Sequence, residues 1–206
     1  MFYRILRSII NFLFNLLARR EYVGLDNVPD EPPYILVTNH LSIFDSPLLL
    51  TVCPHTVRAL AAAKHKRNPI YALLLAAMGS VWVRRGEVDR HALREALDVL
   101  ESGDVLGIAP EGTRARTTHV LQNGKTGAAY LATRAGVSLV PVGITGTENL
   151  HHNMPRLRRT DVRVVVGKPF YLPQGQARSQ ELREYTDLIM RRIADLLPEE
   201  YRGVYA

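Results

Sequence analysis

A histidine and an aspartate stand five residues apart in the segment NHLSIFDSP, residues 39–47. A carboxylate that hydrogen-bonds one imidazole nitrogen fixes the tautomer and leaves the other nitrogen free to take a proton from a substrate. His40 and Asp45 are therefore a candidate general base and its orienting acid. Residues five apart on an ideal helix point about 140° away from each other. We therefore expect the pair in a turn before a helix with Ser46 as N-cap and Pro47 as first residue.

Taken alone, this spacing is a weak signal, because a histidine near an aspartate in a turn is more often structural. The sequence has no G-x-S-x-G elbow and no active-site-like cysteine. Its single cysteine, Cys53, excludes a disulfide framework and is expected to be a small buried hydrophobic side chain. Because no nucleophile need come from the protein, the natural task for His40 and Asp45 is to activate a substrate hydroxyl.

A second polar cluster, Glu111-Gly112-Thr113-Arg114, follows an apolar run and Pro110. Gly112 allows close backbone approach to a ligand, and the Arg114 guanidinium matches phosphate oxygens. Glu111 is expected either to accept hydrogen bonds from a hydroxylated substrate or to hold Arg114. The alternative is a surface pair of glutamate and arginine.

The elements that must position these residues alternate along the chain. Predicted strands cover residues 34–38, 56–63, 80–83, 105–109, 138–144 and 161–167, and predicted helices cover 47–53, 68–79, 89–103, 125–136 and 179–197. This alternation predicts an α/β fold: one domain over residues 21–206, with a mixed, largely parallel central sheet flanked by helices. Ligands gather in the loops at strand ends of such sheets, where both polar clusters and Arg84-Arg85 fall.

Residues 1–20 form a separate unit, predicted to be an amphipathic helix. Its uncharged run, residues 8–18, is shorter than the ~20 residues needed to span a bilayer. The polar positions form one narrow stripe on an otherwise apolar surface: Arg4, Ser8, Asn11, Asn15 and Arg19. We expect this helix to lie in a membrane interface, and the alternative is a helix packed on the domain. The uncharged segment 68–83 is expected to be either a buried core helix or a second surface that touches the membrane.

The formal net charge of +6 favours partners that carry phosphate, namely nucleic acid, anionic lipid or phosphorylated small molecules. The sequence contains no helix-turn-helix, zinc-finger or RNA-binding signature, and its arginines do not form one dense patch with interleaved aromatic residues. Nucleic acid is therefore not an expected partner.

Four blocks occur in the order NHLSIFD, GSVWVRRG, IAPEGTRAR and LVPVGI. This series resembles the glycerolipid acyltransferase family typified by 1-acylglycerol-3-phosphate acyltransferase. That family is marked by N-H-x4-D, a glycine-to-arginine segment with a hydrophobic run, F-P-E-G-T-R-S and V-P-V. The resemblance covers roughly residues 20–170, and Ala109 and Ala115 replace the usual Phe and Ser. The family's N-terminal membrane motif often has two helices, whereas this chain has room for one before its first predicted strand.

The resemblance implies a glycerol-3-phosphate acyltransferase-like fold and an O-acyltransferase that makes phosphatidic acid in phospholipid biosynthesis. His40 would deprotonate the hydroxyl of 1-acylglycerol-3-phosphate (lysophosphatidate), Asp45 would orient His40, and the hydroxyl would attack an acyl thioester directly. Lys125 matches a lysine position in the family and is a candidate contact for the oxyanion or the donor. The acceptor would bind to Arg84, Glu111, Gly112, Thr113 and Arg114, with Arg85 as an alternative to Arg84 on the phosphate. Asn39 and Ser42 are expected to shape the turn.

The implied co-substrate is acyl-CoA or acyl carrier protein, and no metal or redox cofactor is implied. Because the sequence shows no export signal and acyl donors are cytosolic, we expect a peripheral or monotopic protein on the cytoplasmic face of the cell membrane. Three alternatives remain open. The acceptor could be another lysophospholipid, an amino-acid lipid or a glycolipid; His40 could activate water in a lipid hydrolase; or the chain could be a silent lipid-binding protein, against which the intact His40 and Asp45 argue.

Overall fold

The computed structural model describes residues 2–84, 89–115 and 117–206. Within these ranges seven strands form one sheet, in the order β1-β7-β6-β2-β5-β3-β4. The strands are β1 (Ala18–Val23), β2 (Tyr34–Thr38), β3 (Val57–Ala62), β4 (Val81–Val83), β5 (Val105–Ile108), β6 (Ser138–Thr145) and β7 (Thr160–Val166). The main helices are α1 (Phe2–Leu17), α2 (Asp45–Val52), α3 (Pro69–Ala77), α4 (Arg90–Glu101), α5 (Gly127–Ala135), α6 (Leu150–Asn153) and α7 (Ser179–Ala194).

Strand direction divides the sheet into two parts. β2 pairs in parallel with β5 and β6, and β3 pairs in parallel with β4 and β5. β7 is antiparallel to β6, and β1 runs parallel to β7. The mixed, largely parallel sheet with flanking helices that the sequence predicts is therefore confirmed.

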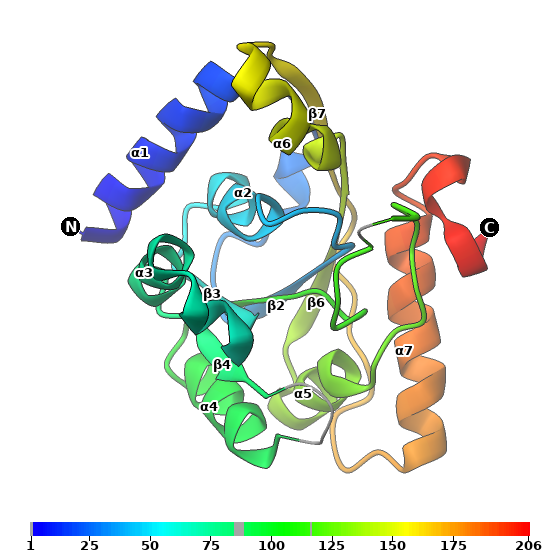
Figure 1. Ribbon diagram of the computed structural model, residues 1–206. Coiled ribbons are helices and arrows are strands. Elements are labelled where there is room, and N and C mark those ends of the chain that lie inside the picture. The colour runs from blue at the N-terminus through cyan, green and yellow to red at the C-terminus, as the bar shows by residue number, and fades with distance from the viewer. Residues whose placement is uncertain (1, 85–88, 116) are drawn as a thin grey trace.

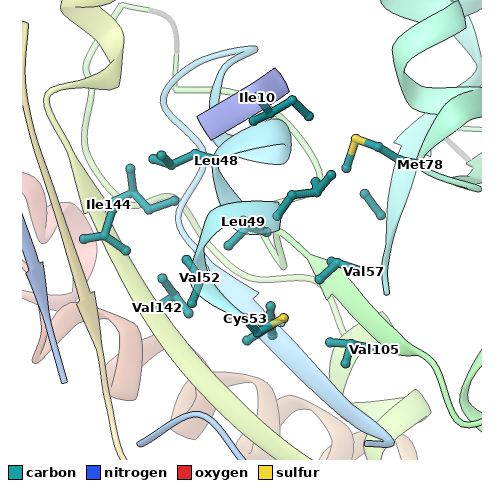
Figure 2. Close-up of a cluster of buried hydrophobic side chains, with 14 of the residues drawn as sticks. Ile10, Leu48, Leu49, Val52, Cys53, Val57, Met78, Val105, Val142 and Ile144 are labelled. Atoms are coloured by element: carbon teal, nitrogen blue, oxygen red, sulfur yellow. The ribbon is translucent and has the colours of Figure 1, made fainter. Parts of the chain in front are cut away.

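Helices cover both faces of the sheet, with α1, α2 and α3 on one side and α4, α5 and α7 on the other (Figure 1). Alternate residues of β2 point to opposite faces: Tyr34 and Leu36 belong to the core under α2, and Ile35 and Val37 to the core under α5 and α7. Figure 2 shows the first of these cores, where side chains of α1, α2 and the strands meet. Cys53 is fully buried there, as predicted.

The start of α2 differs from the prediction. The helix begins at Asp45, and its N-cap is Phe44 rather than Ser46. Pro47 is thus the third helical residue instead of the first. The first four N–H groups of a helix have no intrahelical acceptor, so proline is tolerated at either place. The sequence alone therefore cannot distinguish the two starting points.

Strand β1 is missing from the sequence prediction, which continues the first helix to residue 20. The helix instead ends at Leu17, and β1 begins at the next residue. β1 is an edge strand with charged side chains on its exposed positions, of which Arg19 lies 3.8 Å from Asp161 and Glu21 lies 3.6 Å from Arg163 on β7. Charged residues are a common protection for sheet edges, but pairing with a strand so distant in the chain leaves no local signal.

Helix α1 has two apolar sides. The first packs against the domain through Tyr3, Leu6, Ile10, Phe14 and Leu17. The second is exposed and consists of Ile5, Ile9, Phe12, Leu13 and Leu16. The packed side agrees with the alternative of a helix on the domain, whereas the other side is unpartnered among the described residues, so its placement in a membrane interface stays a prediction. None of the helices in the described ranges is long and apolar enough to cross a membrane.

The polar stripe of α1 bonds to the domain. Arg20 donates to the side-chain oxygen of Asn11 at 3.0 Å and to that of Asn15 at 2.6 Å. At the far end of the helix, the backbone N–H of Val57 donates to the Tyr3 hydroxyl at 2.8 Å. α1 is therefore attached to the sheet near both of its ends, and two asparagines of the predicted polar stripe bond within the protein.

The segment 68–83 contains α3 and β4, as predicted. Asn68 caps α3 by accepting the N–H of Tyr71 at 3.1 Å. Leu75 and Met78 are buried in the core, whereas Leu73 is exposed. Within α3 itself only Leu75 is buried among the residues whose burial is described, and Met78, the C-cap, adds a second buried side chain.

Candidate functional site

The ends of three neighbouring strands define the site. β5, β2 and β6 are adjacent and parallel, so the loops that follow Thr38, Ile108 and Thr145 leave the sheet at the same edge. The first loop carries His40 and the second carries Glu111.

His40 and Asp45 are in direct contact. Their Nδ1 and Oδ2 atoms are 2.9 Å apart, and the same oxygen accepts the backbone N–H groups of Leu41 at 2.8 Å and Ser42 at 2.7 Å. Asp45 is 1% exposed and the His40 side chain is 13% exposed. A carboxylate can only accept, so His40 donates from Nδ1, which leaves Nε2 unprotonated in the neutral ring. No hydrogen bond to Nε2 occurs among the described residues.

Asn39, the residue before the histidine, is held by two hydrogen bonds of its side chain. Its side-chain amide donates to the carbonyl oxygen of Ile144 at 2.7 Å, and its side-chain oxygen accepts the N–H of Ile144 at 2.8 Å. The side chain thereby bridges to β6 where the pairing of β2 with β6 ends. Asn39 and Ser42 thus both take part in the turn, in line with the sequence analysis.

Glu111 holds the backbone of His40. One carboxylate oxygen accepts the N–H of His40 at 2.9 Å, and the other accepts the N–H of Gln122 at 3.1 Å. The carbonyl oxygen of His40 in turn accepts the N–H of Ala115 at 2.9 Å. Glu111 is 3% exposed. The sequence predicts that Glu111 binds the acceptor or holds Arg114; in the structure its two oxygens accept the backbone N–H groups of His40 and Gln122.

Burial raises the pKa of the Glu111 carboxyl from 4.5 to about 7. The two backbone hydrogen bonds act in the opposite direction because they favour the charged form, and the nearby charge of Asp45 adds a smaller upward contribution.

Gly112 and Lys125 lie against each other. Gly112 has a φ of 66°, which favours glycine, and a Cβ at this position would lie 2.9 Å from Cδ of Lys125. The backbone N–H of Lys125 donates to the carbonyl oxygen of Pro110 at 2.8 Å. The structure therefore brings the exposed Lys125 to the turn that also contains Thr113 and Arg114.

Arg84 lies apart from this group. It follows β4, which is three strands from β2 and thus roughly 14 Å away across the sheet. Its backbone N–H donates to Asp89, the N-cap of α4, at 2.9 Å, and its side chain is exposed. Arg85, the alternative phosphate contact, lies outside the described residues.

Thr147 is not among the residues predicted from the sequence, yet it contacts Asp45 directly. Its hydroxyl is 2.5 Å from Oδ1 of Asp45, and the residue is fully buried. Thr147 follows β6 just as His40 follows β2. The rule that polar residues after parallel strands converge at one edge would have found it.

Comparison with known proteins decides the family. The model of the acyltransferase family matches residues 19–145, which contain His40, Asp45 and the turn from Glu111 to Arg114. The chain belongs to the acyltransferase family. Among solved structures, the 1-acyl-sn-glycerophosphate acyltransferase from Thermotoga maritima is similar with a TM-score of 0.72 and 27% identity, over 94% of this chain and 79% of that one. The acyltransferase fold expected from the resemblance is thereby confirmed.

Two curated acyltransferases illustrate the sequence similarity. The 1-acyl-sn-glycerol-3-phosphate acyltransferase of Borreliella burgdorferi is 33% identical over 61% of this chain and 51% of its own length. A chloroplastic 1-acyl-sn-glycerol-3-phosphate acyltransferase of Arabidopsis thaliana is 29% identical over 78% of this chain and 46% of its own length. The chain thus spans about half the length of the curated acyltransferases it matches.

Proposed function

We propose that this chain transfers a fatty acyl group from a thioester to the free hydroxyl of 1-acylglycerol-3-phosphate. The observation that carries the proposal is the 2.9 Å contact of His40 Nδ1 with the buried Asp45, which leaves Nε2 for the acceptor. Matching family members and the similar solved structure carry the name of this activity.

The reaction follows from the tautomer. Nε2 of His40 takes the proton of the acceptor hydroxyl while its oxygen attacks the thioester carbonyl carbon, and Asp45 stabilises the imidazolium. The tetrahedral oxyanion collapses, the carbon–sulfur bond breaks and the thiolate leaves. A thiol has a pKa of about 8.5, so the thiolate needs little acid assistance and the imidazolium can return the proton to it. This route requires no metal or redox cofactor.

Basic side chains around the pair support a phosphate-bearing acceptor. Arg114 belongs to the turn that contains Glu111, and the side chain of Lys125 lies against Gly112 of the same turn. Arg84 is at the end of β4 and would reach only a distal part of a substrate. Lys125 is suited to the oxyanion or to phosphates of an acyl-CoA or acyl carrier protein donor, because an ammonium is a compact positive charge on a flexible stem.

We also propose that the exposed side of α1 lies in the lipid surface. Five large apolar side chains on one side of a helix with arginines at its flanks are typical of interfacial helices. Both the acceptor and the acyl chain partition into bilayers, so docking brings the site to its substrates. The cytosolic origin of acyl donors assigns this surface to the cytoplasmic face of the cell membrane.

The test measures thiol release from a long-chain acyl-CoA, with and without 1-acylglycerol-3-phosphate, by the native protein and by His40→Ala. We expect release that depends on the acceptor and disappears in the variant. Release without acceptor, also lost in the variant, would instead indicate a lipid hydrolase. If acyl-CoA gives no release, acyl carrier protein thioester and other lysophospholipids replace donor and acceptor in turn, and inactivity with all of them contradicts the proposal.

A further inference from the structure

The Asp45 carboxylate has two sides with different partners. Its Oδ2 atom accepts from His40 Nδ1 and from two backbone N–H groups of the same turn. Its Oδ1 atom accepts from the hydroxyl of Thr147, which is distant in the chain. An ionised carboxylate only accepts, so Thr147 is the donor in this contact.

The contact with Thr147 restrains rotation of the Asp45 carboxylate about its last side-chain bond, which the contacts within the turn restrain only weakly. Rotation of a carboxylate about its last side-chain bond is broad and twofold, without sharp minima. Contacts at Oδ2 alone hold one oxygen, whereas a donor at Oδ1 fixes the plane of the whole group. The plane decides whether Oδ2 stays aligned with the N–H of His40, and therefore how firmly the ring is oriented.

The turn after β6 is built to present Thr147. Gly146 has a φ of 89°, and a Cβ there would overlap the backbone oxygen of Asp161 on β7. On the other side of Thr147, Glu148 accepts the hydroxyl of Tyr201 at 2.8 Å. Backbone and side-chain contacts thus fix the turn on both sides of the threonine.

The end of β6 also holds the histidine end of the pair. Ile144 exchanges two hydrogen bonds with the side chain of Asn39, the residue before His40. Thr147, three residues later, bonds to Asp45. The end of β6 and the turn after it therefore contact both ends of the segment from residue 39 to residue 45.

We propose that Thr147 is a positioning residue for the reaction: through its hydrogen bond to Asp45, it keeps the His40 imidazole in the orientation that presents Nε2 to the acceptor hydroxyl. The inference rests on the proposed acyl transfer. Thr147 touches neither substrate by this account, so it acts on the rate of the chemical step and leaves substrate binding unchanged.

Two variants separate the hydroxyl from the shape of the side chain. Thr147→Val keeps the branched shape and removes the donor, and Thr147→Ser keeps the donor and removes a methyl group. We expect kcat to fall about tenfold or more in Thr147→Val, as a part of the ~10²–10⁴-fold that general base catalysis supplies. KM should stay within about twofold of the native value, and Thr147→Ser should recover most of kcat. If Thr147→Val does not fold, Thr147→Ala replaces it.

A second readout does not depend on activity. In protein labelled with ¹⁵N-histidine, the Nδ1 proton of His40 reports its hydrogen bond to Asp45. Its resonance should move in Thr147→Val and remain near the native position in Thr147→Ser. A native kcat and an unmoved resonance in Thr147→Val would overturn the inference, as would equal losses in the two variants. If the native protein transfers no acyl group, the proposed function fails, while the resonance still shows whether Thr147 orients the pair.

Discussion

The Glu111 carboxylate holds the main chain of His40, since it accepts the backbone N–H of His40 at 2.9 Å. The histidine is thus fixed in two independent ways, by Asp45 at the ring and by Glu111 at the backbone. The second contact uses a buried carboxylate with a raised pKa, so it makes the structure sensitive to pH.

The free energy of unfolding should contain a pH-dependent contribution from Glu111. Its pKa is about 7 in the folded protein against an ordinary value of 4.5, so the folded state binds more protons between these values. The free energy of unfolding therefore falls as pH rises from about 4.5 to about 7. The fall amounts to about 3 kcal/mol. Urea unfolding at several pH values should show it in the native protein and not in Glu111→Gln. A matching fall in Glu111→Gln would contradict the assignment, and Glu101→Gln, which removes an exposed carboxylate, is the control.

Asp45→Asn should separate catalysis from folding. The asparagine oxygen can accept from His40, Leu41 and Ser42, and its amide can donate to the Thr147 oxygen, so every contact keeps a partner. Only the negative charge is lost, and with it the support of the imidazolium. We expect kcat to fall about 10³-fold or more, with a small change in the free energy of unfolding. A fall below tenfold in a folded variant would show that the carboxylate is structural.

Gly112→Ala should affect both stability and activity. A residue other than glycine at a φ of 66° costs about 1–2 kcal/mol, and the new methyl group would displace the side chain of Lys125. Gly103→Ala is the matched control, because Gly103 has a φ of 80° and nothing lies within 4 Å of an added Cβ. Both variants should lose similar stability in thermal unfolding, and only Gly112→Ala should lose acyl transfer. If Gly112→Ala and Gly103→Ala transferred acyl groups at equal rates, Lys125 would have no part in the reaction.

Replacement of exposed apolar residues on α1 should weaken binding to lipid vesicles. Ile9 is 52% exposed and Phe12 is 67% exposed, so Ile9→Gln and Phe12→Gln should leave thermal unfolding almost unchanged. Each should reduce sedimentation with anionic phospholipid vesicles about tenfold, as expected from the ~1.5–3 kcal/mol gained when such a side chain is fully buried. The control is Val204→Gln, because Val204 is 64% exposed and lies near the C-terminus, which Figure 1 shows far from α1. Binding that is unchanged in the α1 variants would contradict docking through this helix.

The parts of the fold with a local signal could be predicted from the sequence. β2 has the predicted bounds, 34–38, because a fully buried parallel strand is a short apolar run. The end of the helix predicted over 125–136 was equally predictable, since Gly136 is the C-cap of α5. β1 was not, since its register with β7 depends on residues far away in the chain.

The contacts of the candidate site also separate into those with a local sequence signal and those without one. The contact of His40 with Asp45 could be predicted because both residues lie within one short segment. The contacts of Thr147 with Asp45 and of Glu111 with the His40 backbone could not be predicted, because each joins residues in different loops. A sequence records that a polar residue follows a strand, but not which backbone group it will meet.

The junction of α1 and β1 has a consequence for how the proposed enzyme would meet its substrates. The helix ends at Leu17, the strand begins at Ala18, and Arg159 donates to the Ala18 oxygen at 2.7 Å. With no linker between them, a helix lying in the lipid surface would hold His40 at one height above the headgroups. Each lysolipid would then have to rise to that height to react. Two residues inserted at the junction would change the height, and with it the reaction rate, without altering any side chain of the site.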